Sequence, residues 1–179
     1  MLADPKYSRV VLINRTCGET PAPSGSLAAC SAAFSLLRTG VETFAVPLTV
    51  VGECEALRDG VPEQLAPLMT QLDVDVLCIW QDRRFTDALA SSETRIIVLG
   101  GGWLEEEIFI VALQGAHRGY DVRLLSDTVV ARVEADRPLV FHRLALHGIL
   151  ATTVRQTLLE WAVCRDDPLL KKKVQQLLS

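Results

Sequence analysis

The amino-acid sequence predicts an α/β fold, in which a doubly wound, mostly parallel sheet of about six strands is flanked by helices on both faces. The main observation is that short β-branched runs alternate with longer Ala- and Leu-rich segments of helical periodicity. This alternation is typical of repeated strand–helix–strand units. The 179 residues contain no internal repeat and no low-complexity linker, so we expect a single domain over residues 1–179.

Each element is predicted from its local pattern. The run 10–13 is β-branched and is followed by Asn14, which is typical of a buried first strand. Gly40 is expected to end the first helix, and Pro47 places the second strand at an edge or a bulge of the sheet. The expected strands are 10–13, 44–51, 74–80, 95–99, 120–125 and 149–151. The expected helices are 26–37, 63–72, 85–90, 105–117, 138–146, 153–163 and a last one from about residue 168.

The C-terminal segment 166–179 is expected to form this last helix. Its leucines present more hydrophobic surface than a free tail would tolerate, so the helix must pack on its own domain or on a partner chain. It is therefore a candidate interface element.

Composition excludes several classes of protein. The net charge of −4 argues against a nucleic-acid-binding surface, which needs clustered Lys and Arg. We expect the one basic run, 171–173, to be a solvated helix face. No apolar run approaches the roughly 18 residues of a membrane span, and the N-terminus does not resemble a secretory signal. The five cysteines are widely spread without a CxxC pair, which favours reduced thiols in the cytoplasm over disulfides or a zinc site. We therefore expect no metal, no cofactor, no nucleic-acid partner and no membrane partner.

The expected topology indicates where a functional site should lie. Ligands of doubly wound sheets bind beyond the carboxyl ends of the strands. The residues at these positions are Asn14, Gln81, the turn 100–107 and Asp127. Gly100, Gly101 and Gly102 lack the spacing of a phosphate-binding loop, so we expect them to give the backbone freedom at this turn.

Four stretches, taken in order, carry a family resemblance. They are the first strand 10–14, the strand and turn 96–107, the segment 116–127 with Gly119, Tyr120 and Asp127, and the segment 143–154. As an ordered set they resemble the isochorismatase-like cysteine hydrolases, and they cover the first strand and most of the C-terminal half. The resemblance implies the doubly wound fold and a homo-oligomer, a dimer or larger.

The resemblance also implies a catalytic Cys, Asp and Lys, and this sequence departs from all three. Counting forward from Gly101 and back from Gly119 leads to Glu107 at the Cys position. Asn14 stands at the position of the Asp base, and an amide is no general base. The loop that carries the Lys is shortened, and no lysine occurs between Lys6 and Lys171.

Alternatives remain open for the other candidates. The run 105–107 is either an acid–base cluster or negative charge favoured in a first helical turn, with Glu107 the best candidate for a pocket residue. Asp127 either touches a ligand or caps a turn. Cys78 is expected to be a buried, inert thiol. The expected ligand-pocket residues are Gln81, Gly101, Gly102, Trp103 and Cys17, and Trp103 could instead lie in a subunit interface.

These observations favour a catalytically inactive protein of the isochorismatase-like type, acting as a binding or assembly protein. A small-molecule ligand recognised through Glu107, such as an amine, is compatible with this hypothesis. The alternative is a hydrolase of altered chemistry that uses Glu107 and Asn14 on a small amide or a vinyl ether.

Overall fold

The structure is a computed structural model that describes residues 2–13, 24–52 and 63–178. Its centre is a six-stranded sheet in which every pair of neighbouring strands is parallel, in the order β3-β2-β1-β4-β5-β6. The strands are β1 (Ser8–Ile13), β2 (Leu48–Val51), β3 (Met69–Leu72), β4 (Ile96–Gly101), β5 (Asp121–Leu125) and β6 (Leu150–Thr152). This arrangement confirms the predicted fold class.

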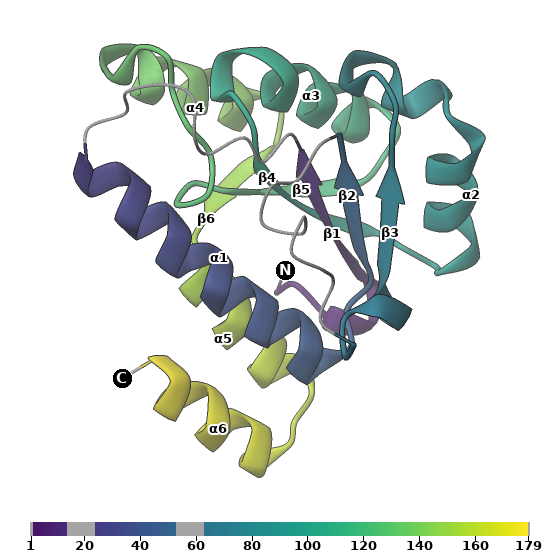
Figure 1. Ribbon diagram of the computed structural model, residues 1–179, viewed down its shortest axis with the longest axis vertical. Helices are drawn as coiled ribbons and strands as arrows, with labels where there is room; N and C mark the ends of the chain where they lie inside the picture. Colours follow the sequence, from purple (N-terminus) through teal and green to yellow (C-terminus); the bar gives the residue numbers. More distant parts are fainter. Residues whose placement is uncertain (1, 14–23, 53–62, 179) are drawn as a thin grey trace.

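Two layers of helices cover the sheet (Figure 1). One layer contains α1 (Ser24–Phe44), α5 (Val154–Cys164) and α6 (Pro168–Leu178), and the other contains α2 (Arg83–Ser91), α3 (Phe109–His117) and α4 (Arg137–Leu146). Each layer has its own core, because successive strand residues point to opposite faces. In β1, Val10 and Leu12 pack toward the α1 layer, whereas Val11 and Ile13 pack toward the α3 layer.

Short helical turns connect these elements. They are the 3-10 helices η1 (Pro5–Tyr7), η3 (Ala66–Leu68), η4 (Val76–Gln81) and η6 (Glu134–Asp136), and the π-helix η5 (Leu104–Ile108). The expected helix 105–117 is therefore divided into a π turn and α3. Among the described residues, no helix is long and apolar enough to cross a membrane.

The prediction of the third strand was wrong. The segment 74–80 is mostly the 3-10 helix η4, and β3 lies earlier in the chain, inside the expected helix 63–72. The buried residues of η4 are Val76, Ile79 and Trp80, a spacing that suits one helical face rather than the alternation of a strand. β3 is an edge strand with two exposed central residues, so its sequence lacks the apolar run expected of a buried strand.

The predicted effects of Gly40 on the first helix and of Pro47 on the second strand were also wrong. α1 continues through Gly40 to Phe44, and the missing side chain at Gly40 leaves room for Leu158 of α5. Pro47 precedes β2, which lies inside the sheet between β1 and β3 and not at an edge.

The last helix, α6, packs on its own chain. Val174 and Leu178 are buried in the core shared by α1 and α5. Leu169 and Leu177 remain exposed on the outside of the helix.

Candidate functional site

The candidate site is built on the turn that follows β4. Gly101 pairs with Ile13 at the carboxyl ends of β4 and β1, and both Gly101 and Gly102 have positive φ, 78° and 62°. A Cβ atom on Gly101 would lie 2.4 Å from the Ile13 carbonyl oxygen. This turn therefore requires glycine for both its backbone conformation and its close approach to β1, as the sequence suggested.

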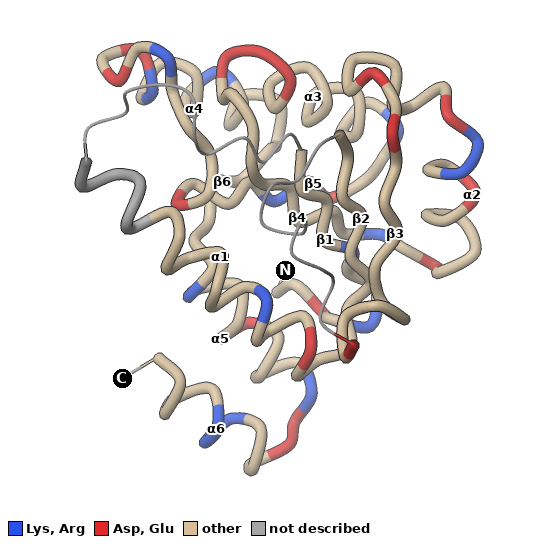
Figure 2. Tube along the Cα trace, viewed as in Figure 1, with Lys and Arg blue, Asp and Glu red and all other residues tan. Residues whose placement is uncertain are grey.

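The π-helix η5 carries the acidic run out of this turn. The Ile108 N–H donates to the Trp103 carbonyl at 3.3 Å, a five-residue step that widens the first turn before α3. Such π turns occur frequently at functional sites. Figure 2 shows the run Glu105, Glu106 and Glu107 as a red arch beside α3 at the upper edge of the molecule.

Two of the three glutamates bind the neighbouring loop. The Arg132 N–H donates to both carboxylate oxygens of Glu105, at 3.0 and 3.2 Å. The Arg132 guanidinium forms an ion pair with Glu106, and its Nη2 lies 3.3 Å from Glu106 Oε2. The hydrogen bond from Arg132 holds the pKa of Glu106 below its usual range.

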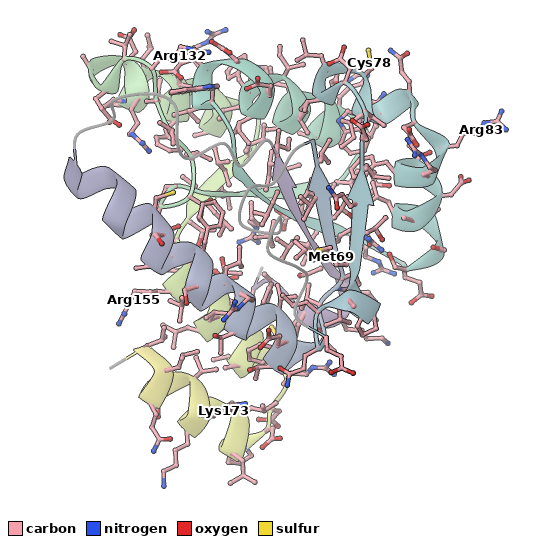
Figure 3. All side chains as sticks on the ribbon, in the orientation of Figure 1. Met69, Cys78, Arg83, Arg132, Arg155 and Lys173 are labelled. Carbon is pink, nitrogen blue, oxygen red and sulfur yellow. The ribbon has the colours of Figure 1, made fainter. Side chains whose placement is uncertain are left out.

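The same guanidinium covers Trp103. Arg132 lies over the indole ring at 4.2 Å from the ring centroid, in cation–π geometry. Figure 3 places Arg132 at the upper end of the molecule, where the strands end. Trp103 therefore holds the loop of Arg132 against η5.

Glu107 differs from its two neighbours. Its side chain is half-buried, and its Oε2 atom is buried with no hydrogen-bond partner. An unpartnered buried polar atom is rare in a folded protein and often marks a functional or ligand-dependent position. Glu107 is thus the one glutamate of the run whose carboxylate has no hydrogen bond to a described residue.

A groove separates η5 from the segment that follows β3. Its volume is about 470 Å³, and its lining residues are Val74, Asp75, Val76, Leu77, Glu106, Glu107 and Ile110. Leu77 and Ile110 are large apolar residues that remain exposed there. Asp75 Oδ1 accepts the Leu77 N–H at 3.0 Å, which fixes the start of η4. The groove combines apolar walls with carboxylates.

The other expected site residues have separate positions. Gln81 is exposed at the end of η4 and is not among the groove residues. Asn14 and Cys17 lie outside the described residues. Asp127 accepts the Val154 N–H at the start of α5, at 3.0 and 3.2 Å, whereas the N-cap residue of this helix is Thr153. Burial raises the pKa of the Asp127 carboxyl group. Cys78 is exposed in η4, so the prediction that it is buried was wrong.

The groove residues of the segment 74–77 were missed in the sequence. Asp75 followed by buried residues at helical spacing is the pattern of a capped helical turn, and it could have indicated η4. In the described part of the chain, no group of three His, Cys, Asp or Glu side chains could hold a metal ion.

Comparisons with known proteins identify the fold. The sequence matches no family profile and no curated protein. The structure is similar to the YcaC gene product from Escherichia coli, an octameric hydrolase of unknown specificity, with a TM-score of 0.75 and 17% identity over 99% of this chain and 90% of that chain. It is equally similar to the MAR1 ribonuclease from Caenorhabditis elegans, with a TM-score of 0.75 and 17% identity over 99% and 92% of the two chains.

An isochorismatase family protein from Burkholderia thailandensis matches with a TM-score of 0.68 and 14% identity over 89% of this chain and 97% of that chain. These matches show that nearly the whole chain has the isochorismatase-like hydrolase fold. The resemblance noted in the sequence is thereby confirmed at the level of the fold.

Proposed function

We propose that this protein is a catalytically inactive member of the isochorismatase-like type, and that it binds a small molecule at the carboxyl edge of its sheet. The observation that carries the proposal is Glu107, a carboxylate with an unpartnered buried oxygen at the turn where the resemblance puts a cysteine. A helix N-terminus favours a thiolate there, and the thiolate attacks a carbonyl carbon. A carboxylate is a far poorer nucleophile toward an amide.

The positions of the expected base and lysine support the same conclusion. Asn14 stands at the base position in the sequence, although it lies outside the described residues. The two arginines nearest to the shortened loop do not replace the lysine. Arg84 is bonded to Asp82 at 2.7 Å, and Arg83 extends away from the molecule on α2 (Figure 3). Neither guanidinium is a proton-transferring amine.

A screen of the purified protein tests this function. Substrates should include nicotinamide, N-carbamoyl amines and vinyl ethers, each assayed for product by mass spectrometry beside the Glu107→Gln variant. We expect no turnover above the uncatalysed reaction. Turnover that Glu107→Gln abolishes would overturn the proposal.

The same residue supports a second candidate, a hydrolase of altered chemistry. A carboxylate without a hydrogen-bond partner can act as a general base on water. In this case Glu107 would accept a proton from water, and the hydroxide would attack the carbonyl carbon of an amide substrate. The tetrahedral intermediate would then break its C–N bond and release the amine, which takes the proton back from Glu107. The screen separates the two candidates, because only the hydrolase produces product that depends on Glu107.

We also propose that the chain forms a homo-oligomer. The structurally similar YcaC gene product is octameric. Large apolar side chains are exposed on α4, β6, α5 and α6, where they would be buried between subunits. These residues are Leu139, Leu146, Leu150, Leu159, Val163 and Leu169. Light scattering coupled to size-exclusion chromatography gives the mass in solution, and a mass of about 19.6 kDa, that of one chain, would contradict the proposal.

A further inference from the structure

We infer that two copies of this chain pair through the outer edge of β6, antiparallel and centred on Ala151, so that their sheets join into one. The inference rests on the proposed homo-oligomer and adds the surface and the symmetry by which the copies assemble. It follows from the backbone of β6, from the side chains that this strand exposes, and from the absence of charge in its sequence.

The central residue of β6 has its backbone polar groups on the outer side of the sheet. β6 pairs with β5, and no described strand lies on its other side. The Thr152 C=O accepts the N–H of Ser126, the residue that follows β5, at 2.8 Å, so the polar groups of Thr152 point toward β5. Successive residues of a strand alternate in direction. The N–H and C=O of Ala151 therefore point to the outer edge, where another strand can bind them.

The side chains of β6 lack the features that protect many free edges. Natural edge strands often carry Lys, Pro or other residues that prevent pairing with a second chain. The opposite edge strand, β3, exposes the polar residues Thr70 and Gln71. β6 instead exposes Ala151 and Leu150, and Leu150 keeps 50% of its surface open to solvent. Of the two sheet edges, that of β6 gains more free energy when it is removed from water.

The helix α4 extends this uncharged edge on one face of the sheet. Arg143 stacks on Phe109 of α3 at 4.7 Å from the ring centroid, so this side of α4 faces α3. In Figure 1, α4 is the last helix of its layer, with α3 on one side only. At about 100° per residue, the residues on the side opposite Arg143 are Pro138, Phe141 and Ala145. None of the three is charged, and Pro138 and Ala145 are exposed.

An edge of this kind is compatible with its own copy. In a two-fold symmetric interface the residues near the axis meet the same residues of the partner, so a charged side chain there would be repelled. The three residues of β6 are uncharged. An antiparallel pair centred on Ala151 would exchange two hydrogen bonds, each from the Ala151 N–H of one copy to the Ala151 C=O of the other. Leu150 would then lie opposite Thr152 of the partner subunit.

A second copy fits this edge better than an extended peptide does. β6 has three residues, so a peptide strand would gain few hydrogen bonds and little buried surface from it. A two-fold axis perpendicular to the sheet would also bring α4 beside α4 of the partner subunit. The second copy therefore adds helix contacts to the strand pairing, and a stable interface needs about 800 Å² from each partner.

The test compares proline variants of the two edge strands by light scattering coupled to size-exclusion chromatography. Ala151→Pro removes an outward N–H and no hydrogen bond to β5, so the chain should fold and the assembly should fall to half the wild-type mass. Gln71→Pro is the matched control. The Leu72 C=O accepts the Gly52 N–H at 2.9 Å, so Gln71 at the centre of β3 also points its N–H outward. This variant should keep the wild-type mass, an even multiple of 19.6 kDa.

A charge exchange at the same position separates pairing from misfolding. Ala151→Lys and Ala151→Glu should each fall to half the wild-type mass, because like charges would face each other across the axis. An equimolar mixture of the two variants should restore the wild-type mass, because opposite charges then face each other. Circular dichroism spectra check that each variant folds.

The outcomes distinguish this inference from the proposals on which it rests. A wild-type mass of one chain would overturn both the homo-oligomer and this interface. If the wild type assembles but the two proline variants have equal masses, or if the mixture of charged variants does not assemble, the interface alone is wrong. Neither result bears on the catalytic inactivity, which the substrate screen tests separately.

Discussion

Replacing Gly101 with alanine tests the turn on which the candidate site is built. The backbone of Gly101 has φ +78°, a left-handed conformation that destabilises a non-glycine residue by about 1–2 kcal/mol. The new Cβ would also lie 2.4 Å from the Ile13 carbonyl oxygen, a backbone atom that cannot rotate away. Overpacking of this kind typically adds about 1–3 kcal/mol. We therefore expect Gly101→Ala to lower the free energy of unfolding by about 2–5 kcal/mol.

Gly148→Ala is the matched control. Gly148 has almost the same φ, +77°, but no atom lies within 4 Å of the position that its Cβ would take. This variant should lose only the conformational contribution of about 1–2 kcal/mol. The difference between the two variants isolates the contact between the ends of β4 and β1.

The measurement is chemical denaturation of both variants, supported by thermal unfolding. In a chain of this size 1 kcal/mol corresponds to about 2–4 °C in Tm, so Gly101→Ala should unfold clearly below Gly148→Ala. Equal stabilities of the two variants would refute the close approach of β4 to β1 at this edge.

Three further predictions concern other parts of the fold. Gly40→Ala places a Cβ 2.1 Å from Leu158 Cδ2, so it should lower the free energy of unfolding by about 1–3 kcal/mol. In the double variant with Leu158→Ala, the loss of unfolding free energy measured by denaturation should be smaller than the sum of the losses in the two single variants. Burial raises the pKa of Asp127 above its ordinary 3.8, so the folded state binds the proton more tightly than the unfolded state. The free energy of unfolding of the wild type should therefore fall relative to that of Asp127→Asn as the pH rises from about 3.8 through the raised pKa. Parallel profiles of unfolding free energy against pH for the two proteins would contradict this. Exposed Cys78 should react with a maleimide in the native protein and buried Cys30 only after unfolding, as peptide mapping by mass spectrometry would show.

The sheet was largely predictable because most of its strands are buried on both faces. β1 and β4 each contain a continuous apolar run, at 10–13 and 96–99, and such runs are recognisable without knowledge of their neighbours. β3 was not predictable in this way, because an edge strand hydrogen-bonded on one side can keep exposed polar residues such as Thr70 and Gln71. Gly40 was misjudged for a related reason: its role depends on Leu158, which approaches it from a helix far away in the sequence.

The candidate site was predictable in one part only. The sequence indicates the glycine turn and Glu107, because they follow a recognisable strand and lie at fixed spacing from Gly119. It does not indicate that Glu105 and Glu106 bind Arg132 while Glu107 keeps an unpartnered oxygen. The opposite wall, from Val74 to Leu77, was hidden by the assignment of this segment to a strand.

A single chemical change can account for the three departures from the hydrolase pattern that the sequence resemblance implies. A cysteine at the turn needs a base to remove its proton, and the resemblance implies that an aspartate and a lysine support this step. A glutamate at this position has no thiol to deprotonate, so it requires neither the aspartate nor the lysine for that step. If position 107 carries a carboxylate, the turn no longer needs a base at position 14 or a lysine on the loop. Asn14 and the shortened loop then remove no function from the turn. With Glu107 the turn has no thiol nucleophile, and this is why binding and not hydrolysis is the activity proposed for this edge of the sheet.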